Sequence, residues 1–240
     1  MPTKTARIVD APDPGSALDL LRNHSLTTLV QQELERQIIH GKLPAGTKLN
    51  EADIAAELRV SRGPVREAFR ALEESGLVRL EKNRGVFVRL IPVEEADEIY
   101  ELRAVLDEFV GRRVAQKASA AEIKTLRGLV DRMDRSVSRN DVDGYHAANL
   151  EFHDALVSLA GNAKLLATYR KLVNELHLYR RATLAQSGAL PVSAGEHHDI
   201  LDKIAAGQSA AAGRALFDHV MGSRERMHRA TKPSRNGKKR

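Results

Sequence analysis

The sequence predicts a mainly α-helical protein with two domains: an N-terminal unit of three helices and a β-hairpin, and a C-terminal all-helical antiparallel bundle. Apolar residues recur at helical spacing over most of the 240-residue chain, and strict alternation of apolar and polar residues is confined to residues 78–90. Aromatic residues make up 4% of the chain and Trp is absent. The core must therefore consist mainly of Leu, Val, Ile and Ala, which favours packed helices.

Three helices are expected in the N-terminal unit, over residues 25–41, 50–58 and 61–76. Asn50 is placed to cap the second helix and Ser61 the third, because their side chains can accept a hydrogen bond from a free backbone N–H. Pro64 falls in the first turn of the third helix, where a missing N–H costs little. Residues 59–61 form the short connection between the second and third helices.

Residues 78–90, with the sequence VRLEKNRGVFVRL, predict a two-stranded hairpin. Its tip is basic and comprises Lys82, Asn83, Arg84 and Gly85. Gly85 permits a tight turn there, since it lacks a Cβ. Three helices followed by a hairpin is the order of a winged helix-turn-helix, which is a DNA-binding fold.

Arginines repeat every four residues on the third helix, at Arg62, Arg66 and Arg70, opposite its apolar face. Arg62 and Arg66 lie nearest the start of the helix, which is the end that enters the major groove, so we expect them to read bases. Arg70 is expected to contact a phosphate. The alternative for such a stripe alone is a solvated helix face, and the preceding short helix and the basic hairpin argue against it.

Two further parts of the module are expected to contact DNA. Ser61 lies at the start of the third helix, where free N–H groups attract a phosphate. The wing residues Lys82, Asn83 and Arg84 can reach the minor groove or the DNA backbone. A net charge of +6 fits a polyanionic partner.

Beyond Pro92 the pattern predicts only helices, over residues 93–117, 119–139, 142–160, 163–187, 191–206 and 208–230. The expected organisation is a disordered segment at 1–21, the winged domain at 22–91, the helical domain at 92–230 and a disordered basic tail at 231–240. We expect the tail to be a solvated end, with a DNA contact as the alternative. Cysteine is absent and the first twenty residues contain no continuous apolar run, so a cytoplasmic protein without a membrane anchor is expected.

Four polar residues fall on the apolar faces of three helices in the second half: Asn149 and His153 one turn apart, His197, and His219. Burying them without partners would cost a few kcal/mol each. Imidazole nitrogens with a side-chain oxygen are a normal ligand set for a divalent transition metal. A single inward His is usually a hydrogen-bonded core residue, but three on separate helices favour a metal site.

The run LNEADIAAELRVSRGPVREAFRALEESGLVRLEKNRGVFV resembles the winged-helix signature of the GntR family of bacterial regulators. The resemblance implies that Ser61, Arg62 and Arg66 occupy DNA-contacting positions and that Gly85 lies in the wing tip. One departure is Ala52, where some members of the FadR branch carry an operator-contacting Arg. The operator contacts are expected to differ there.

The helical half is similar to the FCD effector domain of the FadR branch. The resemblance implies a metal held by Asn149, His153, His197 of the EHHDIL run, and His219. Asn149 stands where the family more often has Asp, which removes one negative charge and leaves the metal open: zinc is expected first, with nickel and manganese as alternatives. Six helices rather than seven would favour a VanR-like arrangement.

Arg103, on the inner flank of its helix, is the expected partner of a carboxylate effector. The alternative for this residue is a salt bridge to Asp107 or Glu108. Family members of this kind bind small organic acids.

The expected function is that of a homodimeric transcription regulator, a repressor, which binds a palindromic operator in double-stranded DNA and responds to a small organic acid at the metal site. No enzymatic activity is expected. A metal-dependent hydrolase is the competing hypothesis, disfavoured because no carboxylate shares the helical faces of the histidines. A second alternative is a nucleoid protein that binds DNA without sequence preference.

Overall fold

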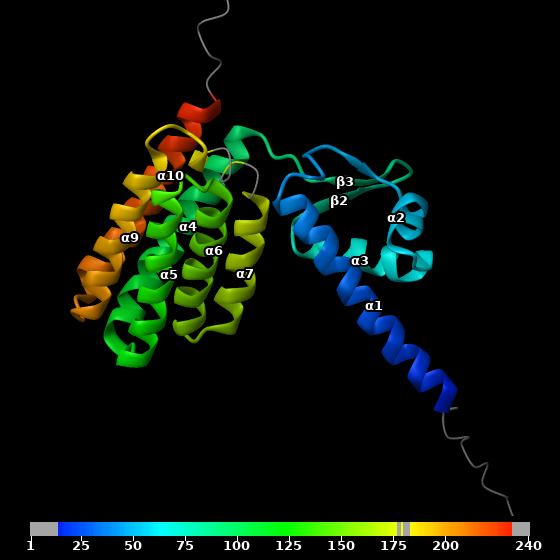
Figure 1. Cartoon of the computed structure of the whole chain (residues 1–240), viewed down its shortest axis with the longest axis horizontal. Helices are drawn as coiled ribbons and strands as arrows, with labels where there is room; N and C mark the ends of the chain where they lie inside the picture. The colour runs from blue at the N-terminus through cyan, green and yellow to red at the C-terminus, as the bar shows by residue number, and fades with distance from the viewer. Residues whose placement is uncertain (1–13, 177–178, 180–182, 232–240) are drawn as a thin grey trace, which may run out of the picture.

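The computed structural model describes residues 14–176, 179 and 183–231, with the side chains of residues 14–25 left out. The expected tail beyond residue 231 and the first thirteen residues lie outside the described residues. Figure 1 shows a small N-terminal domain of helices and a sheet next to a bundle of long helices. The mainly helical fold class predicted from the sequence is confirmed.

Three helices build most of the N-terminal domain: α1 (Pro14–Ile39), α2 (Glu51–Leu58) and α3 (Arg62–Glu74). Asn50 caps α2 as expected, since its side chain accepts a hydrogen bond from the N–H of Ala52. Ser61 occupies the N-cap position of α3, but its hydroxyl makes no capping hydrogen bond, contrary to expectation. Because Ser61 makes no capping hydrogen bond, the backbone N–H groups at the start of α3 remain free.

Helix α1 begins at Pro14, well before the expected start at Ser25, so the expected disorder of residues 14–21 is corrected. Adding a residue to an existing helix costs far less than starting one, and the Leu- and Ala-containing run before Ser25 has good helix propensity. Figure 1 shows this part of α1 projecting away from both domains.

The sheet has three strands, β1 (Lys48–Leu49), β2 (Val78–Glu81) and β3 (Gly85–Val88), in the order β1-β3-β2. The expected hairpin of β2 and β3 is present, with Leu80 opposite Val86. Strand β1 is an addition to the prediction: Leu49 pairs with Val86 on the other edge of β3. A two-residue strand has no detectable alternation, so the sequence could not indicate it.

Helix α4 (Val93–Lys117) begins directly after Pro92, at the expected domain boundary. The helices that follow are α5 (Ala120–Ser138), α6 (Val142–Leu159), α7 (Ala163–Glu175), α9 (Ala189–Ala205) and α10 (Ser209–Thr231). Their bounds agree with expectation within a few residues, except at the end of α7. The single helix expected over residues 163–187 is wrong, because α7 ends at Glu175 and Leu176 is a turn.

Helices α4 and α10 run side by side at very short range because each contributes a glycine to their contact. A Cβ on Gly111 of α4 would lie 2.7 Å from the backbone oxygen of Ala212, and a Cβ on Gly213 of α10 would lie 2.8 Å from the backbone oxygen of Glu108. Real Cβ atoms essentially never approach a backbone atom this closely. This contact aligns α10 with the inner face of α4.

The two domains touch at the end of α3. The side chain of Asn174, on α7, donates a hydrogen bond to the backbone oxygen of Ser75 (3.1 Å), and Arg89 after the wing pairs with Glu175 (3.3 Å) and Glu95 (2.5 Å). Helix α7 therefore links the bundle to the N-terminal domain through polar contacts.

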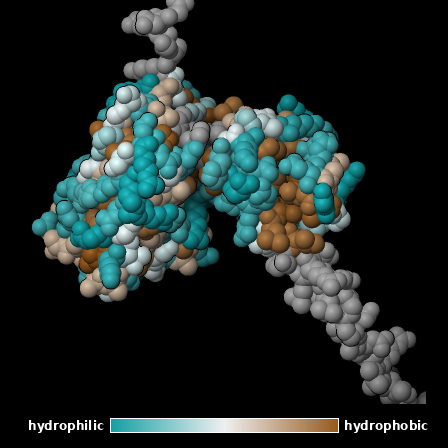
Figure 2. Space-filling view, viewed as in Figure 1, coloured by the Kyte–Doolittle hydropathy of each residue, from teal (hydrophilic) through white to brown (hydrophobic). Residues whose placement is uncertain are grey.

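The face of the bundle in Figure 2 is mainly hydrophilic, whereas the N-terminal domain shows a hydrophobic patch next to the place where α1 leaves it. Leu26 and Leu29 of α1 are exposed. None of the described helices is long and apolar enough to cross a membrane.

The close contact between α4 and α10 predicts that a side chain at Gly111 would destabilise the protein. Gly111→Ala should destabilise the protein by about 1–3 kcal/mol, because the new methyl group forces the two helices apart. Gly128→Ala, on α5, is the matched control: a Cβ there meets nothing within 4 Å, so the substitution should be neutral or stabilise by about 1 kcal/mol through helix propensity. Urea unfolding of both variants measures the difference, and equal stabilities would contradict the close contact.

Candidate functional site

The arginines of α3 face solvent. Arg62, Arg66 and Arg70 are all exposed, whereas Val65, Phe69 and Leu72 on the opposite side are buried in the domain core. The exposed face therefore begins at the N-cap residue Ser61 and continues along the helix. This arrangement presents guanidinium groups and free backbone N–H groups on one surface.

Arg66 is held by an acidic neighbour on α2. Its Nε and Nη2 donate to the two carboxylate oxygens of Glu51 at 3.2 and 2.9 Å, and the Arg66 side chain remains 57% exposed. The hydrogen bonds from Arg66 lower the pKa of Glu51. Ion pairs this exposed contribute little to stability, so Arg66 can leave Glu51 for another partner.

The wing tip is basic and exposed, with Lys82, Asn83, Arg84 and Gly85 all accessible to solvent. Asn83 and Gly85 have φ angles of 62° and 112°. Glycine tolerates such a φ, so Gly85 allows the turn, in agreement with its expected role. Lys48, Arg79 and Arg84 surround the ring of Phe87 at 5.8–5.9 Å from its centroid, which gathers further positive charge at the wing.

In the bundle, the three histidines expected to face inward do converge. His153 of α6, His197 of α9 and His219 of α10 are at most 5% exposed, and one ligand atom from each lies within 4.8 Å of the others. The Nε2 atoms of His153 and His219 are 3.2 Å apart. The Nε2 of His197 is buried and has no hydrogen-bond partner among the described residues.

The Nδ1 atoms of two of these rings are hydrogen-bonded to the surrounding protein. His219 Nδ1 lies 2.7 Å from Glu196 Oε2, and His197 Nδ1 lies 2.6 Å from the backbone oxygen of Ser193. Nδ1 must donate in both contacts, which leaves the Nε2 lone pairs directed into the cluster. His153 Nδ1 is 3.6 Å from Asp107 Oδ1. Histidines that bind metals are typically oriented by such contacts.

Burial favours the neutral form of two of the three imidazoles. It lowers the pKa of His197 well below the ordinary value, and the neighbouring His219 and His153 lower it further. Burial also lowers the pKa of His219, against the opposing effect of Glu196. Neutral imidazoles are the form that binds a metal ion, so burial favours the form of His197 and His219 that can act as a ligand.

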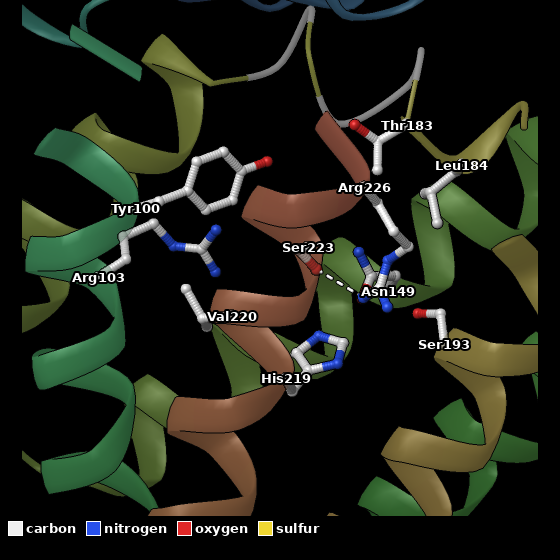
Figure 3. Close-up of a pocket in the computed structure, with 10 residues that line it drawn as sticks. All are labelled: Tyr100, Arg103, Asn149, Thr183, Leu184, Ser193, His219, Val220, Ser223 and Arg226. Atoms are coloured by element: carbon white, nitrogen blue, oxygen red, sulfur yellow. Dashed lines mark hydrogen bonds between the residues drawn. The ribbon is translucent and has the colours of Figure 1, made fainter. Parts of the chain in front are cut away.

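Asn149 lies in α6, one turn before His153, and lines a buried cavity together with His219 (Figure 3). Its Oδ1 is buried and has no hydrogen-bond partner among the described residues. An orphaned amide oxygen beside a cluster of imidazoles fits a hard or borderline metal ion as an additional ligand. The cavity holds about 20 Å³ of free space, which is room for about one water molecule.

Arg103 of α4 also lines this cavity and is 2% exposed. Its Nη2 donates to Tyr169 Oη (2.9 Å) and lies 3.5 Å from Asp107 Oδ2. Burial would lower the pKa of Arg103, but Tyr169 and Asp107 raise it, so the group stays charged. The alternative reading of Arg103 as a partner of Asp107 is thus present in the structure, although the contact is long and its Nε has no partner among the described residues.

The sequence did not indicate Arg226, a charged residue that lines the cavity, or its partner Glu196. Arg226 of α10 is 5% exposed and forms a bidentate ion pair with Glu196 of α9, at 2.8 and 2.9 Å. Burial would raise the pKa of Glu196, but the hydrogen bonds from His219 and Arg226 hold it at about 2. Arg226 follows His219 by two helical turns, so the two residues share one face of α10. This spacing is the feature of the sequence that could have indicated an inward position for Arg226.

Two carboxylates from outside the helical faces of the histidines approach the imidazole rings. Asp107 comes from α4 and lies 3.6 Å from His153, and Glu196 lies at the edge of α9 and contacts His219. Both oxygens of Glu196 are already engaged by His219 and Arg226, which makes it an orienting group.

Two family models match the chain: "Bacterial regulatory proteins, gntR family" over residues 26–88 and "FCD domain" over residues 98–222. The chain is 30% identical over 200 residues to the "Probable D-xylose utilization operon transcriptional repressor" of Paenarthrobacter nicotinovorans, covering 83% of this chain and 88% of that protein. It is 34% identical over 150 residues to the gluconate operon transcriptional repressor of Bacillus subtilis, covering 62% of this chain and 61% of the relative.

A similar fold occurs in a crystal structure described as a transcriptional regulator GntR from Rhodococcus sp. RHA1. The TM-score is 0.73 at 31% identity, over 87% of this chain and 100% of that one. Members of this family are transcription regulators and not enzymes. With its winged helix-turn-helix, its helical effector domain and these relatives, the chain belongs to the GntR family of bacterial regulatory proteins and carries an FCD domain.

Proposed function

We propose that this protein is an operator-specific repressor of the FadR branch, which acts as a homodimer and is controlled by a small organic acid at a metal site in the helical domain. The observation that carries the proposal is the cavity in which His219, Arg103 and Arg226 meet, within a chain whose N-terminal domain exposes an arginine helix. The VanR-like subdivision depends on the number of helices in this domain, and residues 177, 178 and 180–182 lie outside the described residues.

In the DNA-binding domain, we assign base reading to Arg62 and Arg66 and phosphate contacts to Ser61 and Arg70. The free N-terminal end of α3 and the exposure of these side chains support the assignment. The wing residues Lys82, Asn83, Arg84 and Gly85 would lie along the adjacent backbone or minor groove.

In the helical domain, His153, His197 and His219 would hold a divalent transition metal, with Asn149 as a fourth ligand. Three imidazoles favour zinc, with nickel and manganese as alternatives. The bound ion would supply a positive centre that accepts a carboxylate oxygen. The orphaned Asn149 Oδ1 and His197 Nε2 support this ligand set.

Charge around the cavity favours an anionic effector. The buried carboxylate of Asp107 and the half-buried carboxylate of Glu196 are balanced by the buried guanidinium groups of Arg103 and Arg226. A divalent cation bound to neutral ligands would therefore leave a net positive charge in a buried site, which a carboxylate could neutralise. The relative named for a gluconate operon directs the search to sugar acids.

Binding such an effector requires the cavity to open, since its free volume is about 20 Å³. Arg103 and Arg226 are the long side chains on opposite sides of the space, on α4 and α10 (Figure 3). If either guanidinium turns to the effector, Asp107 or Glu196 loses a partner, and the helices that carry them must adjust. The effector can control DNA binding only by binding the two resulting states with different affinity.

The first prediction concerns operator reading. Arg66→Ala should weaken binding about 5- to 100-fold to an operator selected from random duplexes, with a smaller loss on random DNA, because a bidentate base contact disappears. Arg127→Ala, an exposed arginine of α5, is the control and should bind as the unmodified protein does. Fluorescence anisotropy at fixed salt measures both. Equal affinity of the unmodified protein for operator and random DNA would favour the nucleoid alternative.

The second prediction concerns the metal. His197→Gln should lose most of the bound metal, because its Nε2 faces the cluster, whereas the adjacent His198→Gln should keep it, because His198 is exposed and pairs with Asp134. Elemental analysis of the purified proteins measures the metal content. A zinc-dependent rise in melting temperature should occur in the His198 variant only. Equal metal content in the two variants would rule out the proposed ligand set.

A further inference from the structure

A cleft between the two domains shares no lining residue with the cavity beside the histidine cluster. Glu35 and Ile39 of α1 form one wall of this interdomain cleft, and residues of α6 and α7 form the other. The C-terminal end of α1 lies next to α7 in Figure 1. The cleft has about 420 Å³ of free space, which is in the range of small-molecule sites, and such sites are frequent at domain interfaces.

The walls of the interdomain cleft are mainly apolar. The apolar lining residues are Ile39 of α1, Leu150 and Ala155 of α6, and Val173 of α7, and all four are half-buried. Each thus leaves part of its hydrocarbon surface in contact with water. A ligand with an apolar body removes that surface from water, which favours binding.

The charged side chains of the cleft are three carboxylates, those of Glu35, Glu151 and Asp154, and one guanidinium, that of Arg170. Asp154 accepts two hydrogen bonds from Arg170, at 2.6 and 2.8 Å, and Glu151 pairs with Arg132 at the surface. Glu35 forms no ion pair with a described residue, and burial is the one influence on its carboxyl group. The cleft therefore carries an excess of negative charge, and Glu35 is the carboxylate that can pair with a ligand.

Glu35 is half-buried, and burial raises the pKa of its carboxyl group above the ordinary value. The charged form is disfavoured because part of its hydration is lost and no cation among the described residues compensates. A positively charged ligand would compensate for that loss, whereas an anionic ligand would add repulsion. The cleft thus selects by charge as well as by apolar character.

We propose that the interdomain cleft binds a small amine with an apolar body, whose protonated nitrogen pairs with Glu35 while its hydrocarbon part packs against Ile39 and Val173. This ligand differs in charge from the organic acid proposed for the metal site. The inference therefore goes beyond the proposed function and adds a second small-molecule site, which touches both domains at once.

The first test measures ligand charge with the full chain in the absence of DNA. Phenethylamine is a suitable probe because its amine, like that of lysine, is protonated at neutral pH. It should bind about 10- to 100-fold more tightly than phenethyl alcohol, which has the same apolar body without the charge, since a hydrogen bond to a charged group is stronger than a neutral one. Phenylacetate should bind more weakly than either at this cleft. Isothermal titration calorimetry measures all three.

The second test locates the site. Glu35→Gln should weaken phenethylamine binding about 10-fold or more and remove the preference for the amine over the alcohol. Glu33→Gln is the matched control on the same helix: Glu33 pairs with Arg36 and does not line the cleft, so this variant should bind as the unmodified protein does. Val173→Phe should weaken both the amine and the alcohol, because the ring occupies the cleft.

Circular dichroism checks that each variant is folded. Phenethylamine binding that is absent, that is no tighter than binding of the alcohol, or that survives Glu35→Gln unchanged would overturn this site. Survival in the Glu35 variant would also be the result expected if the amine bound a metal ion instead. Operator binding and metal content are measured separately, so failure of the amine site leaves the proposed function to be decided by its own tests.

Discussion

The helical domain depends on one constraint: three imidazoles from three helices must meet with their Nε2 atoms facing one another. His219 and His197 are hydrogen-bonded through Nδ1 to Glu196 and to the backbone oxygen of Ser193, and His153 Nδ1 lies 3.6 Å from Asp107 Oδ1. These contacts set the rotation of α6, α9 and α10 about their axes, since a turn of any one helix would break its contact and expose a buried ring. The close approach of α4 and α10 at Gly111 and Gly213 fixes a fourth helix relative to the same cluster.

Much of this could be predicted because helical periodicity is a local property. It placed His153, His197 and His219 on inward faces, and it placed Arg62, Arg66 and Arg70 on an outward one, as the structure has them. Contacts between helices could not be predicted in the same way. The pairing of Arg226 with Glu196 joins α10 to α9, and the pairing of Leu49 with Val86 joins a two-residue strand to the hairpin. Both depend on how distant elements are packed, which the spacing of residues along one helix or strand does not encode.

Helix α7 lies between the cavity and the DNA-binding domain. Near its middle, Tyr169 donates to Asp107 and accepts from Arg103, and at its end Asn174 and Glu175 contact Ser75 and Arg89. A change in the partners of Arg103 or Asp107 therefore acts on the helix that touches the end of α3. Spatial continuity alone does not establish coupling, which requires an element with two arrangements that both sites favour differently. The contacts between the two domains are few and polar, which makes a second arrangement of the domains accessible.

Two bidentate arginine–carboxylate pairs in this chain show how burial decides what an ion pair can do. Arg66 and Glu51 are 57% and 33% exposed, so water screens their attraction and can solvate either partner when the two separate. The Arg226 side chain is 6% exposed, and separating it from Glu196 would leave a charge in a poorly solvated cavity unless an anion replaced the carboxylate. The same chemistry thus gives an easily exchanged contact on α3 and, beside the cavity of the helical domain, a contact that is costly to break without a replacement charge.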